Sequence, residues 1–128
     1  MTKPTLLIVA HGSRRQASND EVRVLANRLS AVHHEGIGDV EVAFLELAEP
    51  SIADGLANCV NKGAREIVVF PYFLAAGTHV AADIPEEIEA FRAQHPHVSI
   101  SVTPHLGAAP NLPFTILGMV AAGLSMAA

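Results

Sequence analysis

The chain has 128 residues, 50% of them hydrophobic and 16% charged, which fits one folded domain over residues 1–128 and excludes a disordered chain. Thirteen acidic against eight basic residues give a formal net charge of −5 and argue against nucleic acid as the main partner, because phosphate binding needs a basic face. The single cysteine, Cys59, excludes an internal disulfide, and residues 1–10 lack a signal-peptide pattern, so we expect a cytoplasmic protein.

Strand and helix patterns alternate along the first half of the chain. Residues 5–10 form a continuous apolar run, which is typical of a strand buried on both faces of a parallel sheet. Ser18 and Glu21 stand at capping-box spacing and predict that the first helix begins here. Residues 40–45 predict a second strand, and Ser51 opens a second helix that Gly63 closes.

The same alternation continues in the second half. Residues 67–70 predict a third buried strand, and residues 98–102 a fourth. Between them Asp83 and Pro85 predict the start of a third helix, because proline is favoured in the first helical turn. Residues 112–128 carry no charge and fall just short of a bilayer span, so we expect no membrane association. We expect instead a helix buried on the sheet or against a second subunit.

Four strand-helix units in succession predict the fold class. They indicate an α/β protein with a doubly wound, open, parallel four-stranded sheet flanked by helices. In such sheets ligands bind outside the carboxyl ends of the strands. The residues that follow each strand are therefore the candidates for function.

Histidines and a glutamate follow the predicted strands. His11 comes after the first strand, Glu46 after the second, His79 after the third and His105 after the fourth. Imidazole and carboxylate groups suit a first-row divalent metal, and imidazole accepts a proton near neutral pH. Each residue alone also fits a structural role, as a loop histidine bonded to backbone or as a solvated carboxylate. Their gathering at one sheet edge favours a metal site.

Other polar residues leave alternatives open. Arg14 and Arg15 could make the rim of this site positive for an anionic ligand, or could form a solvated loop. Gly12 and Gly77 are expected to permit loop conformations that a side chain would block, and Cys59 fits the core. The remaining histidines fit a helix end and a surface turn: His33, His34, His95 and His97. Phosphate-loop and nucleophile-elbow spacings are missing from the sequence.

Three segments resemble a known family, the short CbiX-type sirohydrochlorin chelatases of the class II chelatases. They are residues 7–14, LIVAHGSR; residues 42–50, VAFLELAEP; and residues 70–85, FPYFLAAGTHVAADIP. The likeness runs from about residue 5 to residue 107, and the third segment is its most specific part. The resemblance implies a chelatase-like sheet with flavodoxin-like strand order.

The resemblance also implies roles for particular residues. His11 would be a metal ligand and the proton acceptor, His79 the second metal ligand, and Glu46 would lie near metal or substrate. The macrocycle pocket would be lined by Leu74, Ala75, Ala76, Gly77 and Thr78, with Arg14 as a further substrate contact. The implied reaction inserts Co²⁺, or alternatively Fe²⁺ or Ni²⁺, into sirohydrochlorin, in cobalamin or siroheme biosynthesis. It needs no permanently bound cofactor, and short members are typically homodimers.

Two other functions use the same residues. A non-catalytic carrier could hold a metal or a tetrapyrrole through the same ligands. A hydrolase on this fold could use His11 as its base, although the sequence offers no matching nucleophile.

Overall fold

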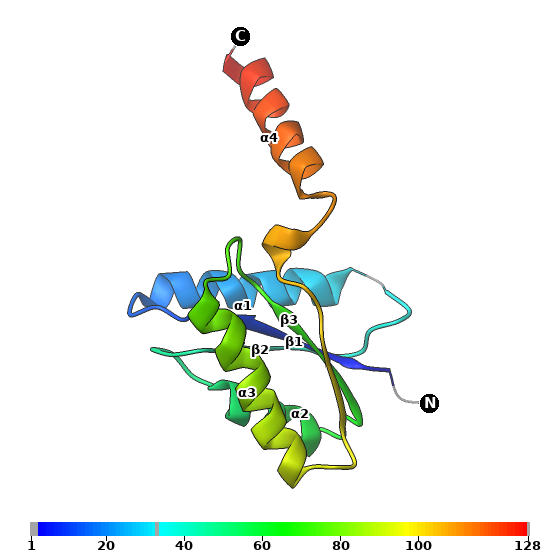
Figure 1. Ribbon diagram of the computed structural model, residues 1–128. Coiled ribbons are helices and arrows are strands. Elements are labelled where there is room, and N and C mark those ends of the chain that lie inside the picture. Colours follow the sequence, from blue (N-terminus) through cyan, green and yellow to red (C-terminus); the bar gives the residue numbers. More distant parts are fainter. Residues whose placement is uncertain (1–2, 33, 128) are drawn as a thin grey trace.

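A parallel sheet forms the centre of the protein (Figure 1). The structure is a computed structural model that describes residues 3–32 and 34–127. Within them the sheet has four strands in the order β2-β1-β3-β4. Their bounds are β1 (Thr5–Ala10), β2 (Val40–Phe44), β3 (Glu66–Pro71) and β4 (Ser99–Val102). This confirms the predicted open parallel sheet and its flavodoxin-like order.

Helices cover both faces of the sheet. α1 (Gln16–Ala31) packs over β1 and β2, where Val22 and Ala26 meet Ile8 and Phe44 in one apolar cluster. α2 (Ile52–Asn61) and α3 (Thr78–Gln94) cover the opposite face. The larger core lies there, and its fully buried side chains include Leu7, Ile52, Leu56, Ile67 and Ile88. The carboxyl ends of the strands stay open to ligands.

α2 begins and ends as its sequence predicts. The Ser51 hydroxyl accepts a hydrogen bond of 3.1 Å from the Asp54 backbone N–H, which satisfies one of the free donors of the first turn. Beyond the helix Gly63 adopts a φ of +97°, the left-handed conformation that glycine permits at a helix end.

The predicted starts of the other two helices are wrong. α1 begins at Gln16 rather than Ser18, and its N-cap Arg15 makes no side-chain cap hydrogen bond. α3 begins at Thr78, five residues before Asp83, so Pro85 lies inside the helix. A proline there removes one N–H donor, and the helix tolerates it because Ile84 and Ile88 are buried in the core on either side. Burial therefore overrides the local start signal.

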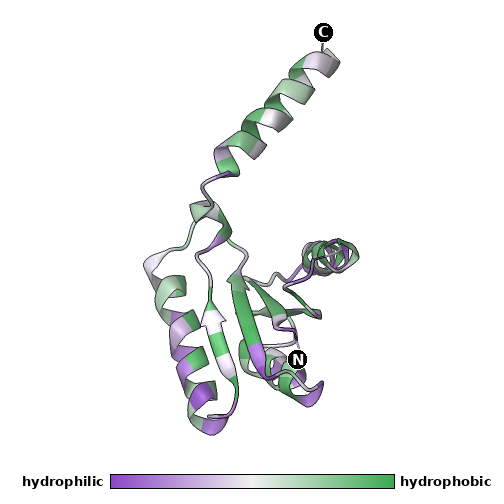
Figure 2. Cartoon of the chain, turned by 90° about the vertical axis from the view of Figure 1, so that its right-hand side faces the viewer, coloured by the Kyte–Doolittle hydropathy of each residue, from purple (hydrophilic) through white to green (hydrophobic). Residues whose placement is uncertain are grey.

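The C-terminal segment leaves the domain. After β4 a short 3₁₀ helix, η1 (Leu106–Ala108), leads to α4 (Leu112–Ala127), which projects away from the sheet (Figure 1). The expectation that this helix is buried on its own sheet is wrong, since Phe114 and Met119 are 73% and 72% exposed. In Figure 2 α4 is mostly green and pale, whereas α3 carries purple on its outer side. No helix within the described residues is long and apolar enough to cross a membrane.

Candidate active site

Backbone contacts join the loops that follow β1 and β2. The N–H of Leu45 donates to the carbonyl of Ala10 (2.9 Å), and the N–H of Glu46 donates to the carbonyl of His11 (3.1 Å). Gly12 has a φ of +91°, and a Cβ there would lie 1.8 Å from the Glu46 carbonyl oxygen. Only glycine fits this position, so the expected role of Gly12 is confirmed. His11 and Glu46 are thereby held side by side.

The loops that follow β3 and β4 are joined in the same way. The N–H of Gly107 donates to the carbonyl of Phe73 (2.9 Å). A Cβ on Gly107 would lie 1.7 Å from the Leu74 carbonyl oxygen, so this contact also requires glycine. Gly77 differs: its φ is −69°, and nothing lies within 4 Å of the place that a Cβ would take. The expectation that a side chain would be blocked at Gly77 is therefore wrong.

The His11 side chain lies between two clefts. Its ring meets the buried Phe73 ring edge to face, with 4.8 Å between the ring centroids. The residue is otherwise exposed, and it lines a cleft on each side. The aromatic contact limits how the imidazole can turn while leaving its polar atoms accessible.

The first of these, the acidic cleft, has a volume of about 310 Å³. Four carboxylates line it together with His11: Glu46 from the loop after β2, and Asp83, Glu86 and Glu87 from α3. None of the described residues lining it is a lysine or arginine. A cleft walled by one sign of charge concentrates ions of the opposite sign, so this side of His11 attracts cations.

The second, the apolar cleft, has a volume of about 390 Å³. Tyr72, Phe73, Leu74 and Ala75 line it from the loop after β3, and Gly12, Ser13 and Val22 line it from the loop after β1 and from α1. Leu74 is 70% exposed, so a flat apolar ligand can cover it. Leu74 and Ala75, both predicted as substrate contacts, therefore lie in one cleft with His11.

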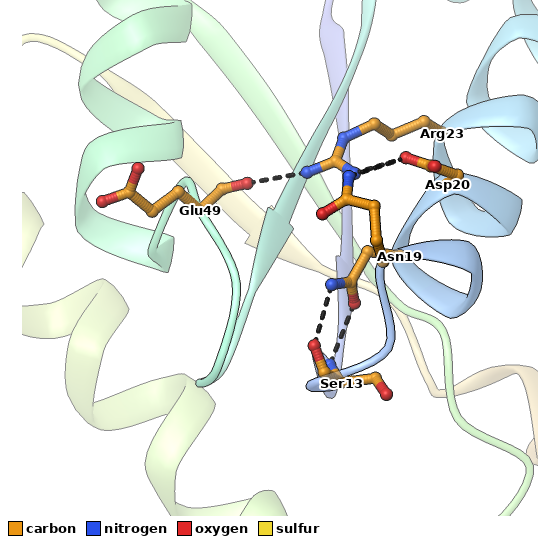
Figure 3. A network of polar contacts seen from close by, with 6 residues as sticks. Ser13, Asn19, Asp20, Arg23 and Glu49 are labelled. Carbon is orange, nitrogen blue, oxygen red and sulfur yellow. Dashed lines mark hydrogen bonds and ion pairs between the residues drawn. The ribbon is translucent and has the colours of Figure 1, made fainter.

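A buried amide fixes the loop that carries His11, as Figure 3 shows. The Asn19 side chain is 5% exposed and pairs with Ser13 twice. Its Oδ1 accepts from the Ser13 N–H (2.9 Å), and its Nδ2 donates to the Ser13 carbonyl (2.8 Å). Sequence reasoning missed this residue, although an asparagine among the apolar positions of α1 is a signal of a specific polar contact.

Arg23, one turn further along α1, ties down the loop after β2. Its guanidinium donates to the Glu49 carbonyl (3.0 Å), forms an ion pair with Asp20 (3.0 Å) and lies 5.2 Å from the centre of the Phe44 ring (Figure 3). α1 therefore anchors the two loops that place His11 and Glu46. Nothing in the sequence around Arg23 predicts this role.

Several predicted substrate contacts lie outside both clefts. Arg14 is exposed and lines neither, and Ala76, Gly77 and Thr78 continue past the apolar cleft into the start of α3. Their contact with substrate stays a prediction. His105 is the N-cap residue of η1 and also lines neither cleft.

His79 stands in the first turn of α3, and its side chain lies outside the described residues. Among the side chains that are described, no three of histidine, cysteine, aspartate or glutamate come close enough to hold a metal ion. The predicted set of His11, His79 and Glu46 therefore stays a prediction. The helical backbone of residue 79 nevertheless follows directly from the loop that lines the apolar cleft.

The remaining candidates have structural places. Cys59 is buried in the core, and that burial raises the pKa of its thiol to about 11, so it stays protonated and binds metal poorly at neutral pH. The His95 ring stacks on Phe91 with 4.0 Å between centroids, at the end of α3 far from the strand carboxyl ends. His34 accepts a hydrogen bond from the Gly36 N–H beyond the end of α1, and His33 lies outside the described residues.

One protein-family model matches most of this chain. The model described as CbiX matches residues 5–120, which include every strand and the first three helices. The chain belongs to the CbiX family. The resemblance drawn from its three sequence segments is thus confirmed.

Relatives in this family carry named activities. The sirohydrochlorin ferrochelatase of Bacillus subtilis (strain 168) is 37% identical over 105 residues, which are 82% of this chain and 40% of that protein. The matched part of the chain therefore spans less than half the length of this relative.

Solved structures in the family agree with the fold. A CbiX protein from Marinobacter aquaeolei VT8 superposes with a TM-score of 0.80 at 30% identity, covering 95% of this chain and 98% of that one. The sirohydrochlorin chelatase SirB from Bacillus subtilis subspecies spizizenii, solved in complex with cobalt, gives a TM-score of 0.71 at 35% identity. That match covers 81% of this chain and 44% of SirB.

Proposed function

We propose that this chain inserts a divalent metal ion into sirohydrochlorin, as a sirohydrochlorin chelatase. The observation that carries the proposal is the position of His11 between an acidic cleft and an apolar cleft. A hydrated cation and a flat, carboxylate-bearing macrocycle need opposite surroundings. The two clefts offer these surroundings on either side of one imidazole.

In this proposal the two substrates bind on different sides of His11. The carboxylates of the acidic cleft attract the metal ion and repel the carboxylates of the macrocycle. The apolar cleft receives the face of the ring against Leu74 and Phe73. The metal ion then meets the ring at His11.

The reaction exchanges one divalent ion for two pyrrole protons, so net charge is conserved. His11 accepts one pyrrole N–H proton through its imidazole and passes it to a carboxylate of the acidic cleft or to solvent, and it then accepts and passes on the second proton in the same way. The same nitrogen cannot hold the metal and a proton together, so the two roles of His11 follow one another. His79 is the proposed second metal ligand and Glu46 the third.

We propose Co²⁺ as the ion inserted, with Fe²⁺ and Ni²⁺ as ions that nitrogen and oxygen ligands also accept. A relative named as a ferrochelatase and a relative structure in complex with cobalt support Fe²⁺ and Co²⁺. The product would enter cobalamin or siroheme biosynthesis in the cytoplasm. No permanently bound cofactor is required, because the metal is a substrate.

We further propose that the active protein is a homodimer. The SirB chain is about twice as long as this one, since 81% of this chain matches only 44% of it. A homodimer would bring two such units together. The exposed apolar helix α4 offers a surface for it.

Turnover tests the proposal against a carrier. Purified protein is mixed under anaerobic conditions with a large excess of sirohydrochlorin and Co²⁺, and the visible absorption of the product is followed. A chelatase forms many products per site. A rise that stops at one product per site would contradict catalysis and support a carrier.

A further inference from the structure

Two histidine rings lie near each other where α3 ends. His95 is the C-cap residue of α3, and His97 follows it after Pro96. The centroids of the two rings are 6.2 Å apart, and the ring planes are tilted by 50°. About 12 Å of helix separates His95 from Glu87, the last residue of α3 that lines the acidic cleft. The histidine pair therefore lies outside that cleft.

The His95 ring is held in one position and one tautomer. Its Nδ1 lies 3.2 Å from the Phe91 carbonyl oxygen. A carbonyl only accepts hydrogen bonds, so Nδ1 carries the proton of the neutral ring and Nε2 carries the lone pair. The ring also stacks on the buried Phe91 ring, with 4.0 Å between centroids and 8° between planes. Histidines that bind metals usually donate their other ring N–H to a carbonyl or carboxylate in this way.

The spacing of the two rings fits one shared metal ion. Bonds of about 2.0–2.1 Å between metal and nitrogen place the ion about 3.2 Å from the centre of each ring, so two rings on one ion have centroids at most about 6.4 Å apart. The observed 6.2 Å lies within this limit. His97 is exposed, so its ring can turn toward the ion while the core stays unchanged.

The charges around the pair are compatible with a cation. Arg92, in the last turn of α3, forms an ion pair with Glu89 and donates to the Ile100 carbonyl, so its positive charge is offset. The carboxyl end of a helix carries partial negative charge, which favours a cation beside it. His95 stands at this end of α3.

We propose that His95 and His97 bind a divalent ion of the late first transition row, with water as the remaining ligands. Imidazole nitrogens suit Cu²⁺, Ni²⁺, Co²⁺ and Zn²⁺. The described residues offer no third histidine, cysteine, aspartate or glutamate to this pair, so the ion stays open to water and exchanges readily. This site is independent of the proposed chelatase activity, because it shares no residue with either cleft.

Paramagnetic Cu²⁺ is the probe that tests the site, since nitrogen ligands bind it most tightly among these ions. Cu²⁺ alone is added to isotope-labelled full-length protein, and the broadening of the Val98 and Ser99 amide signals is followed by NMR. In wild type these signals should broaden at less than one Cu²⁺ per chain. In His97→Ala the same broadening should need at least about tenfold more Cu²⁺, because one of the two protein ligands is lost.

A variant that keeps the packing separates metal binding from structure. His95→Phe retains a ring that can stack on Phe91 but has no ring nitrogen, so it should lose the broadening as His97→Ala does. His34→Ala, an exposed histidine beyond the end of α1, is the control and should respond like wild type. Broadening that persists in His95→Phe would overturn the proposal, as would its absence in wild type with excess Cu²⁺. The NMR readout does not depend on turnover, so failure of this proposal and failure of the chelatase proposal are distinguishable.

Discussion

At the scale of single residues, the position of His11 is set by backbone rather than by its own side chain. Gly12 lets the loop after β2 approach closely, and Asn19 holds the loop after β1 through Ser13. The imidazole itself meets the Phe73 ring edge to face. The imidazole is therefore placed by its neighbours and stays accessible from both clefts.

Asn19→Ala should loosen this placement. The change leaves the N–H and the carbonyl of Ser13 without their partners, which should lower the free energy of unfolding by about 1–3 kcal/mol. Denaturant unfolding measures the loss, and kcat should fall as well. Asn27→Ala, on an exposed face of the same helix, is the control. Equal effects of both substitutions would show that Asn19 has no special role.

Glu86→Gln with Glu87→Gln should separate the two substrates. Both carboxylates line the acidic cleft and neither lines the apolar cleft. Losing two negative charges should raise the KM for Co²⁺ several-fold and leave the KM for sirohydrochlorin nearly unchanged. Steady-state kinetics with each substrate varied in turn measures both constants. A rise confined to sirohydrochlorin would contradict the assignment of the clefts.

The sequence predicts candidate site residues but not how the fold holds them. His11 and Glu46 could be placed at one edge because parallel strands end together. The roles of Asn19 and Gly107 could not be predicted, because each contacts a loop whose path is set only in the folded backbone. The division of the site into an acidic and an apolar side was also missed. It arises because α3 begins early and brings Glu86 and Glu87 beside His11.

At the scale of elements, strands were easier to predict than helix starts. Continuous apolar runs such as residues 5–10 coincide with β1 because they must be buried on both faces. Capping signals are weaker, worth about 1 kcal/mol each, and burial of a helix face outweighs them. Ser51 caps α2 as predicted, whereas Ser18 lies inside α1 and Pro85 inside α3.

The buried Cys59 thiol of α2 should make the free energy of unfolding fall at alkaline pH. Burial raises the pKa of the Cys59 thiol to about 11 from an ordinary 9.0. The unfolded chain therefore ionises first, and as pH rises from about 9 to 11 the folded state loses stability, by roughly 2–3 kcal/mol at most. Urea unfolding across this range should show a steeper decline for wild type than for Cys59→Ala. Equal declines in the free energy of unfolding for wild type and Cys59→Ala would contradict this role of the thiol.

At the scale of the whole molecule, the chain is one CbiX unit with an exposed apolar helix, α4. The sequence predicts that residues 112–128 must be covered, because they carry no charge. It does not predict whether the covering surface is the chain's own sheet or a second copy, because both would bury the same side chains. The direction of α4 away from the domain favours the second copy.

The central claim is that His11 is the group at which metal and macrocycle meet. Its most direct test is anaerobic product formation from sirohydrochlorin and Co²⁺ by His11→Ala and by His105→Ala, a histidine of the same sheet edge that lines neither cleft. His11→Ala should lose at least about a hundredfold in kcat, as expected for removal of a catalytic acid-base group, while His105→Ala stays close to wild type. Turnover by His11→Ala at the wild-type rate would contradict the account.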